Sequence, residues 1–142
     1  TPVDAYETAL DLNLLSVVGM AKAAVPAMQA QRWGRFVAIT SLSVRQPMAN
    51  LILSNTARAG VTGFLKTVAL EVAADGVTVN SVQPGLHATD RVRQLYGDGT
   101  PGGRIGDPAD FGAVVAFLCS QQANYVTGLQ LHVDGGTFGG LQ

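Results

Sequence analysis

Helical and strand-like apolar patterns alternate along this chain, and the alternation constrains its fold more than any other feature. Residues 36–39 form a short continuous apolar run, typical of a parallel strand covered on both faces. Residues 77–82 and 129–133 are two further predicted strands. Apolar residues recur every three or four positions in the predicted helices, which cover residues 3–31, about 55–74, and the segment that begins at 107. The order helix–strand–helix–strand–loop–helix–strand predicts right-handed crossovers and an α/β fold with a parallel sheet.

The boundaries of these elements carry their own signals. Gly76 follows Asp75 at the expected end of the second helix, and Pro84–Gly85 turns the chain out of the second strand. Asp107 and Pro108 provide an N-cap and a first-position proline for the last helix. Six of the ten residues 97–106 are Gly or Pro, so residues 86–106 are expected to form a long mobile loop.

Charge and composition exclude several kinds of partner. The net charge is −1 and the nine basic residues are scattered, so no stripe exists to neutralise nucleic acid phosphates. No apolar run approaches the roughly 18 to 20 residues of a membrane span, so none is expected, and a signal-peptide pattern is missing at the start. The only cysteine, Cys119, allows no intrachain disulfide and suits the cytoplasm. Its apolar helical surroundings predict that it is buried.

Polar side chains gather where the first strand ends. Thr40 and Ser41 leave the sheet at its carboxyl edge, where open α/β sheets place their chemistry. Ser54 follows Ser41 by thirteen residues, and Arg58 follows Ser54 by four, which puts both on one face of the second helix. Each serine also has a structural interpretation: Ser41 as a strand-end cap, and Ser54 as the N-cap of a helix that opens at Asn55.

This frame resembles the active-site segment of the short-chain dehydrogenase/reductase family, in which Ser is followed at this spacing by Tyr-x-x-x-Lys. Ser54 stands at the Tyr position and Arg58 at the Lys position. Further motifs of the family follow in order along the whole chain: Asn-Leu-x-x-x-x-Gly at 13–19, Pro84–Gly85 with Thr89, Gly-Asp-Pro at 106–108, Tyr-Val-Thr-Gly at 125–128 and Val-Asp-Gly-Gly at 133–136. The resemblance implies a Rossmann-like doubly wound parallel sheet with helices on both faces.

The resemblance implies catalytic roles for Asn13, Ser41, Ser54 and Arg58. In the family, the Asn interrupts its helix and holds a water of the proton relay; a capping or kinking Asn is the alternative here. The Ser steadies the substrate oxygen, the Tyr exchanges the proton, and the Lys lowers the phenol pKa. Ser54 cannot simply replace the Tyr, because its aliphatic hydroxyl is far less acidic than a phenol and its side chain is shorter. Arg58 keeps a positive charge but is a poor proton donor.

The cofactor implied by the resemblance is NAD or NADP, bound by the intact parent protein. The positions that match are Pro84, Gly85 and Thr89, which would contact the nicotinamide carboxamide and a phosphate, and Arg58, which would hold the ribose. A glycine-rich phosphate loop between a strand and a helix is missing. Residues 1–142 are therefore expected to be one incomplete Rossmann-like domain that lacks its amino-terminal dinucleotide-binding half.

The resemblance thus implies an oxidoreductase that passes hydride between NAD(P)(H) and a small carbonyl or alcohol, with a 3-oxoacyl-like compound as one candidate. A homodimer or homotetramer is expected. A non-catalytic dinucleotide- or ligand-binding relative that lost the Tyr/Lys pair is the alternative, and a purely structural role is a third. A metal site has no support, because His87 and His132 have no second ligand at a suitable spacing.

Overall fold

The computed structural model describes residues 1–97 and 104–141 and contains a parallel three-stranded sheet. Its strands are β1 (Gly34–Ile39), β2 (Val77–Pro84) and β3 (Gln130–Val133), in the order β1-β2-β3. Gly34 pairs with Val77 at one end of the first ladder, and Ser81 pairs with Gln130 at the start of the second. All three strands therefore end at the same edge of the sheet.

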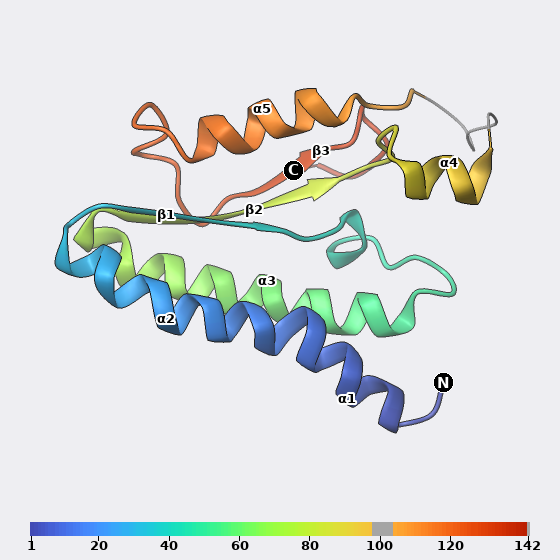
Figure 1. Cartoon of the computed structure of the whole chain (residues 1–142), viewed down its shortest axis with the longest axis horizontal. Coiled ribbons are helices and arrows are strands. Elements are labelled where there is room, and N and C mark those ends of the chain that lie inside the picture. Colours follow the sequence, from blue (N-terminus) through green and yellow to red (C-terminus); the bar gives the residue numbers. More distant parts are fainter. Residues whose placement is uncertain (98–103, 142) are drawn as a thin grey trace.

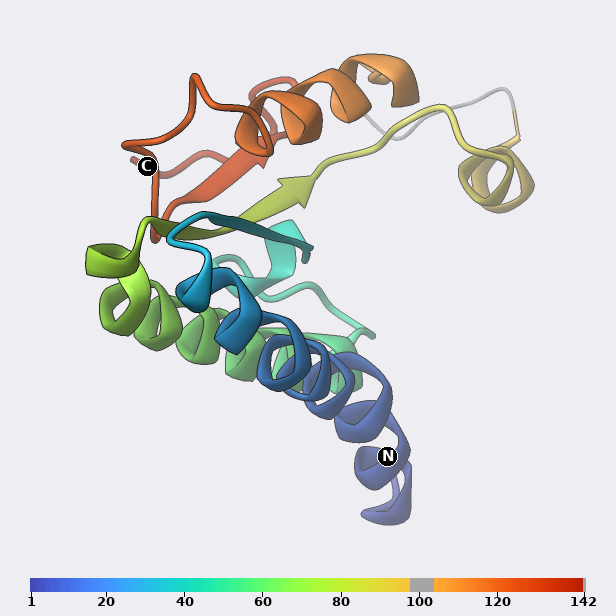
Figure 2. The same ribbon diagram turned by 60° about the vertical axis from the view of Figure 1, so that its left-hand side comes forward.

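Helices cover both faces of this sheet (Figure 1). One face carries a continuous helical rod, made of α1 (Asp4–Leu10), the π-helix η1 (Asp11–Leu15) and α2 (Ser16–Ala30), and beside it the helix α3 (Ile52–Val72), which runs in the same direction. The other face carries α5 (Pro108–Leu118), while α4 (Asp90–Tyr96) stands off beyond the end of β2 (Figure 2). Two short 3-10 turns complete the list, η2 (Leu42–Val44) and η3 (Ala73–Asp75). The predicted α/β fold with a parallel sheet is confirmed.

The main core lies between the sheet and the α2–α3 layer. Alternate residues of β2, Val77 and Val79, point into it, and both are 1% exposed. They meet the apolar stripes of the two helices, which contribute Ala21, Val25, Val61, Leu65, Ala69 and Val72. Full burial of a Val or Leu side chain is worth about 1.5–3 kcal/mol, so this layer holds the sheet in place.

On the opposite face, the buried side chain of Arg35 ties β1 to the segment that follows α5. Its Nε donates to the Ser120 carbonyl at 3.1 Å, and its Nη2 donates to the Asn124 Oδ1 at 3.0 Å. Its Nη1 donates to the Gly34 carbonyl at 2.8 Å, and the guanidinium lies 4.9 Å from the Trp33 ring centroid. One side chain thus links residues that are more than eighty positions apart.

The expected loop 86–106 is wrong for residues 90–96, which form α4. Thr89 caps this helix by accepting the Val92 N–H at 3.3 Å, and Asp90 adds an acidic residue in the first turn. The glycines that suggested a loop begin only at Gly97. Residues 98–103, part of the same expected loop, lie outside the described residues.

Two other expectations also need correction. Cys119 is exposed rather than buried, because it is the C-cap of α5 and not an inner position of that helix.

The rod Asp4–Ala30 has a mean hydropathy of 1.3 over its most apolar window, so one helix is long and apolar enough to cross a membrane. One such helix is weak evidence for a span, because the core helix of a soluble protein and a signal sequence meet the same criterion. Here α2 packs against β1 and α3.

We predict that Arg35→Met lowers the free energy of unfolding by about 3 kcal/mol, because it leaves one buried and several partly buried acceptors without a charged donor. Chemical denaturation measures the change. Arg91→Met, at an exposed position of α4, is the control and should change stability by less than about 0.5 kcal/mol. Equal effects of the two substitutions would contradict the structural role of Arg35.

Candidate active site

Ser41 lies directly beyond β1, at the carboxyl edge of the sheet. Its backbone is extended, with φ −161° and ψ 152°, and it is the N-cap of η2. The Ser41 Oγ accepts the Ser43 N–H at 3.1 Å. The capping role is therefore present, and it uses only a lone pair. This bond leaves the hydroxyl proton able to donate to another group.

Ser54 and Arg58 form a hydrogen-bonded pair at the same edge. The Arg58 Nε donates to the Ser54 Oγ at 3.3 Å, as the four-residue spacing on one helix face requires. The Arg58 Nη1 reaches across to the backbone carbonyls of Ile39 at 3.3 Å and Thr40 at 3.4 Å. These bonds place a guanidinium beside the last residues of β1, next to Ser41. Partial burial lowers the pKa of Arg58 from its ordinary value.

The interpretation of Ser54 as an N-cap is wrong. α3 begins at Ile52, three residues before the expected start, and Leu51 is its N-cap. The side chain of Asn55 explains the earlier start, because its Nδ2 donates to the Met48 carbonyl while its backbone N–H donates to the Leu51 carbonyl at 2.8 Å. The Ser54 hydroxyl is consequently not used in capping.

Asn13 lies in the middle of the π-helix η1. Its Nδ2 donates to the Ala9 carbonyl at 3.0 Å, which is the carbonyl one turn earlier in the rod. This side-chain bond competes with the regular backbone ladder, and the widened turn is the expected result. The rod is thus widened at Asn13, but it is not broken there. η1 packs on α3, where a Cβ at Gly60 would lie 3.2 Å from Leu14 Cδ2.

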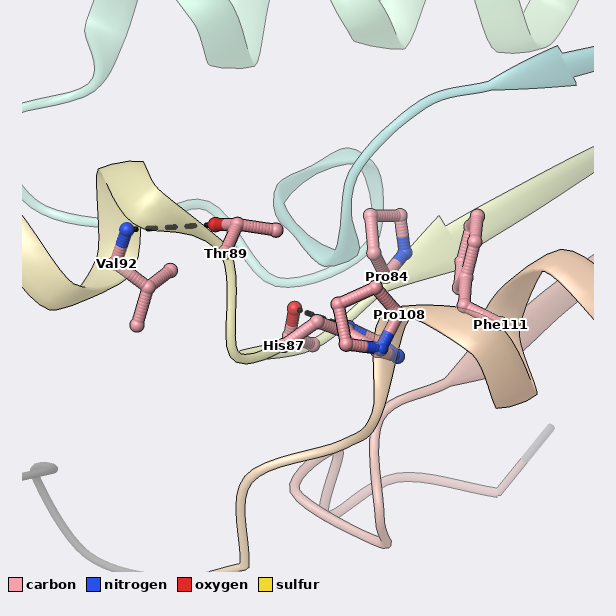
Figure 3. A pocket seen from close by; sticks show the side chains of 7 residues that line it. Pro84, His87, Thr89, Val92, Pro108 and Phe111 are labelled. Atoms are coloured by element: carbon pink, nitrogen blue, oxygen red, sulfur yellow. Dashed lines mark hydrogen bonds between the residues drawn. The ribbon is translucent and has the colours of Figure 1, made fainter.

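A second group of candidate residues follows β2. Pro84, Gly85 and Thr89 line a cavity of about 280 Å³ together with His87, Val92, Pro108 and Phe111 (Figure 3). Gly85 has no room for a side chain, because a Cβ there would lie 2.7 Å from the Asp134 Cα. The Thr89 Oγ1 accepts from Val92 and so, like that of Ser41, keeps its proton for a ligand.

The predicted residues therefore fall into two clusters and one outlying position. Ser41, Ser54 and Arg58 meet at the end of β1, whereas Pro84, Gly85 and Thr89 surround the cavity at the end of β2. The strands are neighbours, so the clusters share one edge of the sheet, but no residue of the first cluster lines the cavity. Asn13 belongs to the helix layer beneath this edge.

The sequence reasoning missed the two buried histidines as features of this edge. His87 lines the cavity, and His132 packs edge-on to Phe138 with 4.5 Å between ring centroids. The only signal was their position, each near the carboxyl end of a strand. Both ring nitrogens of His132 are without a hydrogen-bond partner among the residues that the structure describes. Within residues 1–97 and 104–141, no three His, Cys, Asp or Glu side chains are grouped to hold a metal ion.

The pKa of His132 is lowered chiefly by burial of the ring. The positive charge of Arg45 lowers it further, and the negative charge of Asp134 opposes both effects. The neutral imidazole is therefore favoured in the folded protein.

A parallel α/β sheet with polar groups gathered at its carboxyl edge is the arrangement of doubly wound, nucleotide-binding proteins. A family model described as enoyl-(acyl carrier protein) reductase matches residues 1–137. The chain belongs to the short-chain dehydrogenase/reductase family.

Curated relatives include the 3-oxoacyl-[acyl-carrier-protein] reductase of Vibrio harveyi, which is 38% identical over 95% of this chain. Nodulation protein G of Azospirillum brasilense is 36% identical over 92% of it. The match covers 58% and 56% of those two proteins, so the chain spans less than two thirds of their length.

Solved structures share the fold. The L-sorbose reductase of Gluconobacter frateurii, complexed with NADPH and L-sorbose, superposes with a TM-score of 0.88 and 26% identity, covering 99% of this chain and 61% of that one. YwfH, an NADPH-dependent reductase involved in bacilysin biosynthesis, superposes with a TM-score of 0.92 and 24% identity, and the coverage of the two chains is again 99% and 61%. At 24% identity, the second comparison supports the fold alone.

We predict that His132 makes stability fall on acidification. The unfolded chain has an ordinary histidine pKa of about 6.5 and the folded one a lower value, so the unfolded state binds the proton more readily. The contribution is intact above about pH 6.5 and is lost as pH falls from there through the folded pKa.

Urea denaturation of the wild type and of His132→Phe at pH 7.5, 6.5 and 5.5 measures this effect. Between pH 7.5 and 5.5 the wild type should lose more unfolding free energy than the variant, because Phe cannot be protonated. A difference that stays constant with pH would contradict the prediction.

Proposed function

We propose that this chain is the carboxyl-terminal part of a cytoplasmic NAD(P)-dependent oxidoreductase that passes hydride between the cofactor and a small carbonyl or alcohol, with a 3-oxoacyl-like compound as the candidate substrate. The observation that carries the proposal is the cluster of Ser41, Ser54 and Arg58 at the carboxyl end of β1. The named activities of the reductase relatives support the substrate class.

The residues at the edge fit a nicotinamide dinucleotide. Thr89 has a free hydroxyl proton and borders a cavity of about 280 Å³, and the turn at Gly85 presents backbone without a side chain. Arg58 would hold ribose hydroxyls. When bound, the nicotinamide supplies or accepts the hydride. NADPH is named for the L-sorbose reductase and for YwfH, and the cofactor proposed for this chain is NAD or NADP.

The chain's own groups would act on the substrate oxygen. Ser41 donates a hydrogen bond to it, and Arg58 places a positive charge beside the negative charge that develops there. The Ser54 hydroxyl is too weak an acid to supply the proton, so a water molecule has to deliver it. Asn13, in its π-helical turn, is the residue we assign to holding such a water.

A non-catalytic dinucleotide- or ligand-binding protein is the second candidate. It is favoured by the bonds of Arg58 to the carbonyls of Ile39 and Thr40, because these bonds give the guanidinium a structural use that needs no reaction. Cofactor binding without turnover would select this candidate.

Ser54 and Arg58, which stand at the Tyr and Lys positions of the family motif, give the direct test of the proposed chemistry. Residues 1–142 are joined to the complementary amino-terminal portion of the Vibrio harveyi reductase, and turnover of a simple ketone is measured with NADH and NADPH. Ser54→Tyr together with Arg58→Lys should raise kcat by about 10²- to 10⁴-fold, the usual contribution of a positioned general acid. Either change alone should do little, because phenol and cation act as a unit.

The control is Ser41→Ala in the restored protein, which should lower kcat by removing a donor to the substrate oxygen. If the unrestored protein already turns over at ordinary rates and the double change slows it, then Ser54 and Arg58 serve a different mechanism.

We also propose a homodimer or homotetramer built on the α1–α2 rod and α3. Apolar side chains of the rod stand in solvent, including Leu12 at 71%, Leu15 at 53% and Met20 at 57% exposure. A patch of this kind marks a contact surface.

We predict that the chain self-associates at micromolar concentration and that Leu12→Glu with Leu15→Glu weakens association by at least about tenfold, because charges would enter the contact. Light scattering measures the mass. Val3→Glu, at an exposed position near the chain start, is the control and should change nothing. A monodisperse wild-type monomer would contradict the assembly.

A further inference from the structure

His87 lies inside the turn that connects β2 to α4, and its imidazole bonds back to the start of that turn. The ring is 9% exposed, and its Nδ1 lies 3.1 Å from the Gly85 carbonyl oxygen. A carbonyl oxygen only accepts, so the Nδ1 carries a proton and donates it. Because this bond spans two residues, it fixes the backbone of Leu86 between them.

The other side of the ring packs against the segment that enters α5. Its centroid is 5.0 Å from that of Phe111, with an interplanar angle of 76°. A Cβ at Gly106 would lie 2.7 Å from the imidazole Cδ2 and 2.8 Å from Nε2, so the ring occupies the space that any larger residue at 106 would need. Figure 3 shows His87 beside the Pro108–Phe111 side of the cavity.

Two backbone hydrogen bonds run alongside the ring. The Ala88 N–H donates to the Gly106 carbonyl at 2.9 Å, and the Gly106 N–H donates to the Leu86 carbonyl at 3.0 Å. This isolated parallel bridge joins the turn after β2 to the entry of α5, and the imidazole lies between the two. A purely apolar residue would fill the same space, but it would leave the Gly85 carbonyl without this donor.

We infer that His87 is a positioning residue: its imidazole clamps the 85–89 turn to the entry of α5 and so sets where Gly85 and Thr89 face the ligand cavity. Its effect on cofactor binding rests on the function proposed above, whereas the clamp itself does not.

The chain offers a matched control for this role. His132 has nearly the same exposure, 8%, and also packs edge-on to a phenylalanine, but its ring nitrogens make no hydrogen bond. His87→Phe keeps the ring and removes the donor. His87→Asn removes the ring and keeps a donor at the Nδ1 position. His132→Phe makes the same exchange of ring at the other site.

The clamp is tested on residues 1–142 by amide hydrogen exchange of Ala88 and Gly106, followed by NMR. His87→Phe should speed exchange of both amides about tenfold, while His87→Asn recovers most of the protection and His132→Phe leaves it unchanged. When His87 is present, Gly106→Ala should also speed exchange, because the added methyl group would displace the imidazole. In a protein that already carries His87→Ala, the same substitution should have little further effect.

The functional arm uses the joined protein described above. His87→Phe should raise the KM for the cofactor about tenfold with kcat nearly unchanged, and His87→Asn should restore it. Unchanged exchange in His87→Phe, equal effects of His132→Phe, or a loss in kcat rather than in KM would each overturn the proposal. If the unmodified joined protein binds no cofactor, the proposed function fails, and the exchange measurement still decides the clamp.

Discussion

The hydrogen bonding of β2 to a strand on each of its edges is the constraint on which the candidate site depends. The ladders continue past the regular strands, since the Thr40 N–H donates to the Val82 carbonyl at 2.9 Å and the Gly85 N–H donates to the Val133 carbonyl at 3.0 Å. A shift of either register by one residue would turn every side chain to the opposite face. Ser41 and Gly85 are therefore held at one edge by backbone bonds, before any contact between their own side chains.

Arg58, at the position where the family motif has a lysine, is bound to the protein itself. A lysine ammonium is a compact charge that can turn toward a ligand, whereas the guanidinium of Arg58 is a planar fork. Its Nε and Nη1 are already used on Ser54 and on two backbone carbonyls of the β1 end. The charge remains at the edge, but much of its hydrogen-bonding capacity now holds α3 to β1.

Elements with strong local signals were predictable from the sequence. The helix stop at Gly76, where φ is 74°, and the Asp107 cap of α5 depend on neighbouring residues alone. The early start of α3 was not predictable, because it depends on the Asn55 side chain reaching Met48. The exposure of Cys119 depends on where α5 ends against the sheet, and the grouping of Ser41 with Arg58 was predictable only because their spacing matches a known family.

The π-helical turn at 11–15 has a consequence for how the rod tolerates insertions and deletions. A π turn contains one residue more than the α turn that it replaces, and each residue rotates a helix by about 100°. In a regular α-helix an extra residue would therefore rotate α1 by that angle relative to α2, whereas the wider π turn takes up the residue within one full rotation. Removal of one residue from η1 would thus return the rod to a regular α-helix and leave the faces of α1 and α2 in the same relation.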